Sequence, residues 1–187
     1  MYTETTSTTT PKTARPWPDY EAMVTELLAD SRWVRQAYAN DYPQLGDPRM
    51  RSSTHVDFYT VGVKGARQSG KTLWAIRRLD TETLVLCSNQ TFQRAFREEL
   101  ERMAGDHWDE DLCPRVLTYR DCISHIDFHV RTGGIVPFGA LRTVKTVIVD
   151  EADHMLGQAR GDQTKMMRVI SRWSRLGGQV PELITLG

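Results

Sequence analysis

The chain has 187 residues, a length that predicts one ordinary domain, with or without a disordered tail. Its 40% hydrophobic and 26% charged residues are typical of a globular chain and argue against disorder throughout or a fibrous repeat. Twenty-four basic residues balance 24 acidic ones, which excludes a histone-like polycation but leaves room for a local basic patch. No apolar stretch approaches the ~18 residues of a membrane-spanning helix, and residues 1–10 carry no secretory pattern.

The residues before position 55 divide into a tail, a helix and a loop. Threonines and prolines dominate residues 1–16, which predicts a disordered tail because little there can be buried. From Asp19, a suitable N-cap, apolar residues recur at helical spacing as far as the stop signal at Asn40 and Pro43. Residues 17–54 are therefore predicted to form a helix and a loop. The predicted apolar face comprises Met23, Val24, Leu27, Leu28, Val34 and Tyr38.

From residue 55 to residue 187, apolar runs rich in β-branched residues alternate with helical segments. The predicted strands are Phe58–Val63, Thr83–Ser88, Arg115–Thr118, Thr143–Asp150 and Leu183–Leu186. The predicted helices between them are Lys71–Leu79, Gln90–Met103, Tyr119–Ile126 and Asp162–Leu176. Such alternation implies a mainly parallel sheet covered on both faces, so the predicted fold class is α/β.

The three cysteines, Cys87, Cys113 and Cys122, have no CxxC spacing. This argues against a disulfide framework and favours a reducing compartment, so we expect a cytoplasmic protein. Cys122, His125 and His129 have spacings that a zinc site could use. A fourth ligand is missing and the local pattern is helical, which favours packing over metal binding.

Residues 65–72 fit the pattern of a phosphate-binding loop. They read Gly65-Ala66-Arg67-Gln68-Ser69-Gly70-Lys71-Thr72, which matches G-x-x-x-x-G-K-[ST] between a predicted strand and a predicted helix. Glycines allow a tight turn whose N–H groups point at phosphate oxygens, and the helix N-terminus adds positive charge. Lys71 should reach the β- and γ-phosphates, and the Thr72 hydroxyl should ligate Mg²⁺. The alternative is a chance match on an ordinary strand–turn–helix, and the surrounding pattern counts against it.

About eighty residues later, the apolar strand that ends at Val149 is followed by the carboxylates Asp150 and Glu151. Asp150 would hold Mg²⁺ through its water shell, and Glu151 would orient and deprotonate the attacking water. Alone, such a pair is as often a turn or helix cap, but the phosphate loop favours the catalytic interpretation. Asp153 could cap the next helix, and His154 could couple to the γ-phosphate or face solvent. A catalytic glutamate beside a metal-binding aspartate indicates ATP hydrolysis, although no adenine pocket is visible in the sequence.

These two motifs resemble motifs A and B of the additional-strand, catalytic-glutamate P-loop ATPases. The nearest likenesses are the ATPase domains of phage large terminases and the first RecA-like domain of superfamily 1 and 2 helicases. Asp150-Glu151-Ala152-Asp153 spells the DEAD box, and Arg67, four residues before Lys71, resembles the terminase arginine that acts on the γ-phosphate. The resemblance covers roughly residues 58–187. It implies a three-layer αβα P-loop NTPase (RecA-like) with an N-terminal helical extension, Mg²⁺ with ATP, a phage or mobile-element origin and the host cytoplasm.

Two further segments agree with the resemblance. Residues 84–89, followed by a helix through Arg94 and Arg97, resemble the motif Ia region that faces nucleic acid in helicases. Residues 183–187 resemble the strand of the coupling motif, in which Thr185 would sense the γ-phosphate; the alternative is an ordinary sheet residue. Gln44 is a weak candidate for an adenine-contacting glutamine.

The expected partners follow from the same resemblance. A terminase motor continues into a nuclease domain and a helicase needs a second RecA-like domain, and neither follows here. We therefore expect a minimal ATPase completed by other subunits, as a homo-oligomer or with a second motor or nuclease subunit.

A basic stripe on the last predicted helix is the candidate nucleic-acid contact. Its members are spaced three and four residues apart, which places them on one side of a helix, where they could track phosphates. They are Lys165, Arg168, Arg172 and Arg175. The alternative is a solvated face. The sequence thus predicts an ATPase coupled to DNA, packaging-terminase-like or helicase-like. The competing hypothesis is a non-motor ATP-binding regulator or assembly factor with slow hydrolysis, and DNA-stimulated turnover separates the two.

Overall fold

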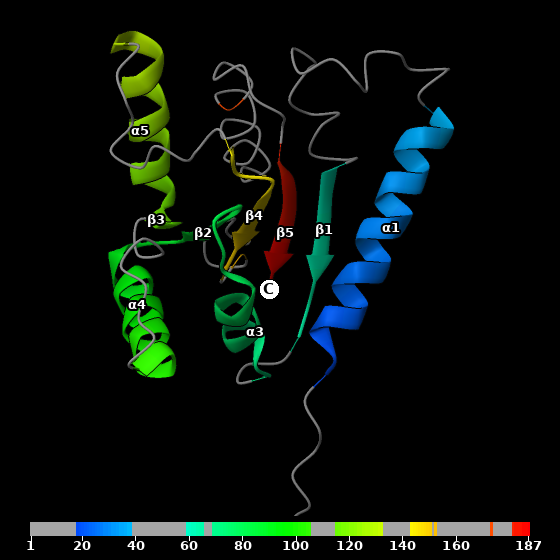
Figure 1. Cartoon of the computed structure of the whole chain (residues 1–187), viewed down its shortest axis with the longest axis horizontal. Helices are drawn as coiled ribbons and strands as arrows, with labels where there is room; N and C mark the ends of the chain where they lie inside the picture. Colours follow the sequence, from blue (N-terminus) through cyan, green and yellow to red (C-terminus); the bar gives the residue numbers. More distant parts are fainter. Residues whose placement is uncertain are drawn as a thin grey trace, which may run out of the picture.

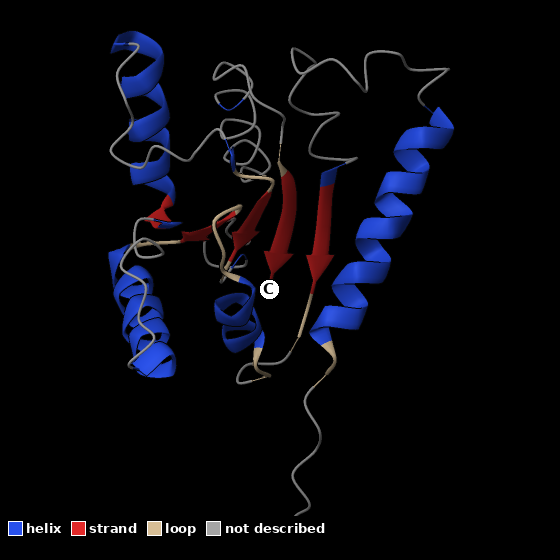
Figure 2. Cartoon of the chain, in the orientation of Figure 1, coloured by secondary structure: helices blue, strands red, loops and turns tan. Residues whose placement is uncertain are grey.

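A computed structural model describes residues 18–38, 59–65, 69–105, 115–132, 143–150, 152, 173 and 181–187. Five strands form one parallel sheet in the order β1-β5-β4-β2-β3 (Figures 1 and 2). The strands are β1 (Thr60–Val63), β2 (Thr83–Cys87), β3 (Val116–Thr118), β4 (Thr146–Val149) and β5 (Glu182–Leu186). The helices are α1 (Tyr20–Tyr38), α3 (Lys71–Arg78), α4 (Gln90–Ala104) and α5 (Tyr119–Thr132). The predictions of an α/β class and a parallel sheet are confirmed.

Helices cover both faces of the sheet. Successive side chains of a strand point in opposite directions, so each strand contributes residues to both faces. Along β2, Leu84 and Leu86 pack in one hydrophobic cluster with Ile126 of α5. Val85 and Cys87 pack in a second cluster with residues of α1, α3 and α4. Every residue of β2 is buried, which explains why its sequence is a continuous apolar run and not an alternating one.

Helix α1 belongs to the second cluster and lies beside β1 (Figure 1). Asp19 caps it as predicted, because its Oδ1 accepts a hydrogen bond of 3.0 Å from the Ala22 amide. Its buried residues, spaced four apart, are Tyr20, Val24 and Leu28. The predicted apolar face was partly wrong, because Met23, Leu27 and Tyr38 are exposed. The helix packs beside the outermost strand, β1, and buries only a narrow stripe there.

Several element boundaries differ from those predicted. Helix α5 continues six residues beyond Ile126, because no glycine interrupts it before Gly133 and the Thr132 hydroxyl bonds the Phe128 carbonyl at 2.9 Å. Strand β4 begins at Thr146, three residues later than expected, and β1 begins at Thr60. The predicted helix 162–176 lies outside the described residues except for Trp173, which is buried. Among the described helices, none combines the length and apolar character needed to cross a membrane.

An ion-pair cluster joins the second half of α1 to the start of β5. Arg32 Nη2 lies 2.6 Å from Glu182 Oε2, and Arg35 Nη2 lies 2.7 Å from Glu182 Oε1. The Arg35 guanidinium also lies 4.2 Å from the centroid of the Tyr59 ring. Burial pushes the pKa of Glu182 up, but the hydrogen bonds and charges of the two arginines outweigh it, so this pKa is lowered. The ionised carboxylate therefore stabilises the folded chain.

Replacing Glu182 by glutamine should destabilise the fold at neutral pH by about 1–2 kcal/mol, the value of a few hydrogen bonds to a charged group. Because the folded pKa is depressed, this stabilisation is complete above the unfolded value and is lost as pH falls through the folded one. The difference between wild type and Glu182→Gln in urea unfolding should therefore narrow below pH 4.5. Glu99→Gln, at an exposed pair with Arg102, is the matched control and should change stability far less. An equal loss in both variants would contradict this role of Glu182.

Candidate active site

The two sequence motifs meet at the carboxyl edge of the sheet. Strand β1 leads into the predicted phosphate loop at Gly65, and Asp150 directly follows the end of β4 at Val149. Both lie at the same edge because all strands run in the same direction. Strand β5 lies between them and holds the start of the loop. The Gly65 amide donates to the Gly187 carbonyl at 2.9 Å, and the Gly187 amide donates to the Val63 carbonyl at 3.0 Å.

The second half of the loop turns directly into α3. Gly70 has a φ of 87°, a left-handed conformation that favours glycine, and Lys71 begins the helix. No side chain caps this helix from position 70, so its first N–H groups carry their partial positive charge to the loop. Lys71 Nζ donates to the Gly65 carbonyl at 2.8 Å, which folds the lysine side chain back over the loop. An amide-lined, positively charged turn of this kind can hold an anion such as a phosphate group.

The two predicted metal ligands lie in contact. Thr72 Oγ1 donates to Asp150 Oδ2 at 3.1 Å and lies 3.3 Å from Oδ1, although 78 positions separate them. Asp150 is only 6% exposed, and its amide bonds the Leu86 carbonyl at 3.0 Å, so it continues the ladder between β4 and β2. A hydroxyl and a carboxylate are the hard oxygen ligands that Mg²⁺ prefers. The pair therefore fits part of a Mg²⁺ ligand set, and the other ligands would have to come from beyond these two side chains. No group of three His, Cys, Asp or Glu side chains suited to a metal occurs in the described part of the chain.

Tyr20, which the sequence reasoning did not single out as a functional residue, contacts the phosphate loop from α1. Its hydroxyl donates to Ser69 Oγ at 2.6 Å, and the residue is 4% exposed. A Cβ atom added to Gly65 would lie 2.8 Å from this hydroxyl and 3.0 Å from Ser69 Oγ. The loop is therefore packed against the first turn of α1. The sequence offered one signal, an aromatic residue at the start of an amphipathic helix, but nothing that tied it to a loop 49 residues away.

Thr185 lies level with Gly62 and Val149 in the register of the sheet. Its Oγ1 donates to the Val61 carbonyl at 3.3 Å, and a Cβ on Gly62 would lie 3.2 Å from the same oxygen. The hydroxyl thus contacts the backbone of β1. Its role as a γ-phosphate sensor stays a prediction.

The motif Ia-like segment has a clear structural role at both of its ends. Asn89 caps α4, because its Oδ1 accepts hydrogen bonds from the Thr91 and Phe92 amides at 2.9 and 3.1 Å. Arg97 points inward and donates to the Val116 carbonyl of β3 at 2.7 Å, whereas Arg94 is exposed. A nucleic-acid contact of this segment stays a prediction, and of the two arginines only Arg94 is exposed.

Cys122, on the buried side of α5, packs in the hydrophobic core and is fully buried. Burial raises the pKa of its thiol to about 12, so the sulfur stays protonated and behaves as an apolar group. The remaining candidates lie outside the described residues, and their roles stay predictions. They are Gln44, Ala66, Arg67, Gln68, Glu151, Asp153, His154, Lys165, Arg168, Arg172 and Arg175.

Comparisons of the chain with known protein families, with curated proteins and with solved structures find no match. A functional conclusion therefore depends on the geometry of these residues and on the chemistry that they can perform.

The contact of Tyr20 with the loop can be tested by a double-mutant cycle. Gly65→Ala should destabilise the wild type by roughly 1–3 kcal/mol, because the new methyl group meets the Tyr20 hydroxyl. The same change should cost clearly less in a Tyr20→Phe background, where that oxygen is absent. Denaturant unfolding measures each corner of the cycle, and Tyr38→Phe, on the exposed end of the same helix, is the matched background. Additive costs in both backgrounds would contradict the contact.

Proposed function

We propose that this chain binds ATP with Mg²⁺ and hydrolyses it. The observation that carries the proposal is the contact between Thr72 at the end of the phosphate loop and Asp150 at the end of β4. A chance match to the loop pattern would not require a carboxylate beside its final hydroxyl. The same pair is what a nucleotide-bound Mg²⁺ needs from the protein.

Each residue of the site has a distinct part in this proposal. The amides at the start of α3 and the Lys71 ammonium hold the phosphates. Thr72 and Asp150 hold the Mg²⁺, which neutralises charge on the β- and γ-phosphate oxygens when bound. Glu151 takes a proton from the attacking water, since it directly follows Asp150. Arg67 lies within the loop sequence and stabilises the charge that develops on the γ-phosphate in the transition state.

The place of β5 supports the RecA-like form of the proposal. This strand separates β1, which feeds the loop, from β4, which carries Asp150. An additional strand in this position is what the resemblance to the additional-strand ATPases implies. The proposed coupling to DNA depends on that resemblance and on the basic stripe at Lys165, Arg168, Arg172 and Arg175.

Lys71→Ala should lower ATP turnover by roughly 10²-fold or more, because it removes a charge that meets the phosphates. Its side chain is not part of the core, so the far-UV circular dichroism should be unchanged. Lys145→Ala, which breaks the pair with Glu82 before the start of β4, is the matched control and should retain activity. In the same assay, measuring phosphate release with and without single- and double-stranded DNA tests whether DNA stimulates ATP hydrolysis. Full activity of Lys71→Ala would overturn the proposed function.

Glu151→Gln should bind ATP and fail to hydrolyse it, because the amide keeps the shape of the side chain but cannot accept the proton. A positioned base contributes about 10²–10⁴ to the rate, and single-turnover kinetics would show a loss of this size with unchanged ATP affinity. Wild-type turnover in this variant would place the base elsewhere, and Asp153→Asn would then be the next variant to measure.

A further inference from the structure

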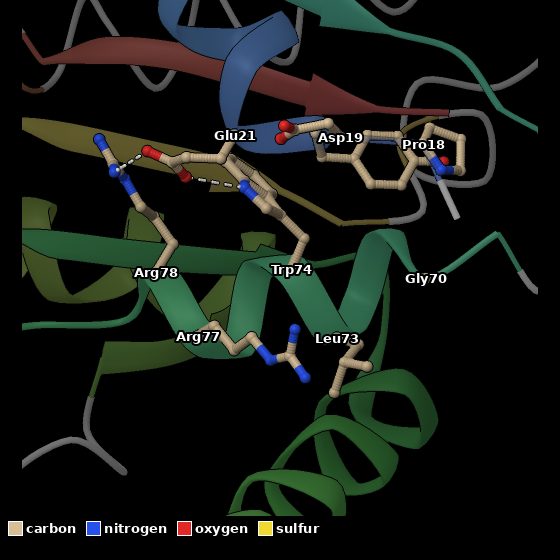
Figure 3. A pocket seen from close by; sticks show the side chains of 9 residues that line it. Pro18, Asp19, Glu21, Gly70, Leu73, Trp74, Arg77 and Arg78 are labelled. Carbon is tan, nitrogen blue, oxygen red and sulfur yellow. Dashed lines mark hydrogen bonds and ion pairs between the residues drawn. The ribbon is translucent and has the colours of Figure 1, made fainter. Parts of the chain in front are cut away.

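A pocket of about 400 Å³ lies between the first turn of α1 and the exposed side of α3 (Figure 3). This size falls within the roughly 300–1,000 Å³ typical of small-molecule sites. Helix α3 and its N-cap, Gly70, contribute lining residues at helical spacing. Gly70 is the second glycine of the predicted phosphate loop. The lining residues are Pro18, Asp19, Tyr20, Glu21, Gly70, Leu73, Trp74, Arg77 and Arg78. The pocket therefore opens directly beside the proposed phosphate site.

The direction of a bound nucleotide follows from the order of the strands. The contact of Thr72 with Asp150 places the metal and the terminal phosphate on the β4 side of the loop. Helix α1 packs on the other side, against β1, two strands away from β4. A triphosphate laid across the start of α3 with its γ-end at Asp150 thus directs its α-end toward α1. That end carries the nucleoside, and the pocket lies there.

The walls of the pocket suit a nucleoside. Pro18 and Leu73 offer apolar surface for a base. The Trp74 ring is held in place because its Nε1 donates to Glu21 Oε2 at 3.0 Å, and Glu21 also pairs with Arg78 (Figure 3).

One cation at the pocket is available for a ligand. The Arg77 side chain is exposed and points away from Glu21 in Figure 3. Within the described part of the chain, no hydrogen bond or ion pair holds its guanidinium. Arg77 can therefore stack on the base.

We infer that the pocket between α1 and α3 binds the nucleoside of the nucleotide, so that the first turn of α1 forms part of the substrate site. This inference rests on the proposed function and deepens it. The site then selects nucleoside triphosphates over inorganic polyphosphates. The bond from Tyr20 to Ser69 holds the pocket and the loop in one arrangement.

The test compares binding of Mg²⁺-ATP and Mg²⁺-tripolyphosphate to the full chain by calorimetry. Wild type should bind ATP at least tenfold more tightly than tripolyphosphate, because only ATP fills the pocket. Leu73→Gln should reduce this ratio about fivefold, by weakening the apolar contact with the base, while tripolyphosphate affinity stays unchanged. Leu27→Gln, at an exposed leucine of α1 outside the pocket, is the matched control and should keep the wild-type ratio.

Arg77→Ala is a second variant that cannot disturb the core, since the side chain is exposed, and it too should lower the ratio. Equal affinities of wild type for the two ligands, or a ratio that Leu73→Gln and Arg77→Ala leave intact, would overturn the inference. In that case, if Lys71→Ala still abolishes binding of both ligands, the proposed phosphate site stands and only the nucleoside pocket is wrong. If the wild type binds neither ligand, or if Lys71→Ala leaves the binding of both unchanged, the proposed function fails. The inference then fails with it.

Discussion

The pairing of β5 with β1 on one side and with β4 on the other is the constraint on which the candidate site depends. Strands β1 and β4, which lead to the loop and to Asp150, are not neighbours in the sheet. Their relative position along the strand direction is therefore set by β5, which pairs with both. The register aligns Val63 with Leu186 and Val149 with Thr185. A shift of β5 by one residue would turn its buried side chains to the opposite face, and the packing on both faces forbids it. The relative position of Thr72 and Asp150 thus depends on the packing of β5, a strand that carries neither residue.

The sequence revealed much of this arrangement because its signals are local. A near-continuous apolar run such as residues 84–87 indicates a strand buried on both faces, and the cap Asp19 marks where a helix begins. The two motifs also singled out Thr72 and Asp150 as metal ligands, a role that stays a prediction, and the structure brings these two side chains together.

Other features could not be predicted, because they depend on which segments pack together. The buried stripe of α1 is Tyr20, Val24 and Leu28, whereas periodicity alone also admitted Met23 and Leu27. The choice between adjacent stripes is made by the shape of the surface that the helix meets. The contact of Tyr20 with Ser69 and the pocket beside it follow from that choice. Sequence periodicity shows that a helix has an apolar side, but it cannot show which tertiary neighbour that side will have.

Helix α1 is attached to the rest of the domain at two places along its length. Near its first residue it is joined to the loop through Ser69, at the carboxyl edge of the sheet, and in its second half it is joined to Glu182, at the amino edge. Its 19 residues span about 28 Å at 1.5 Å per residue, longer than any strand it crosses. A helix bends little over such a length, so a displacement of Ser69 that carried Tyr20 with it would also change the geometry at Arg32 and Arg35. One helix thus bonds both the start of β5, at the amino edge of the sheet, and the loop residue Ser69 at the opposite edge.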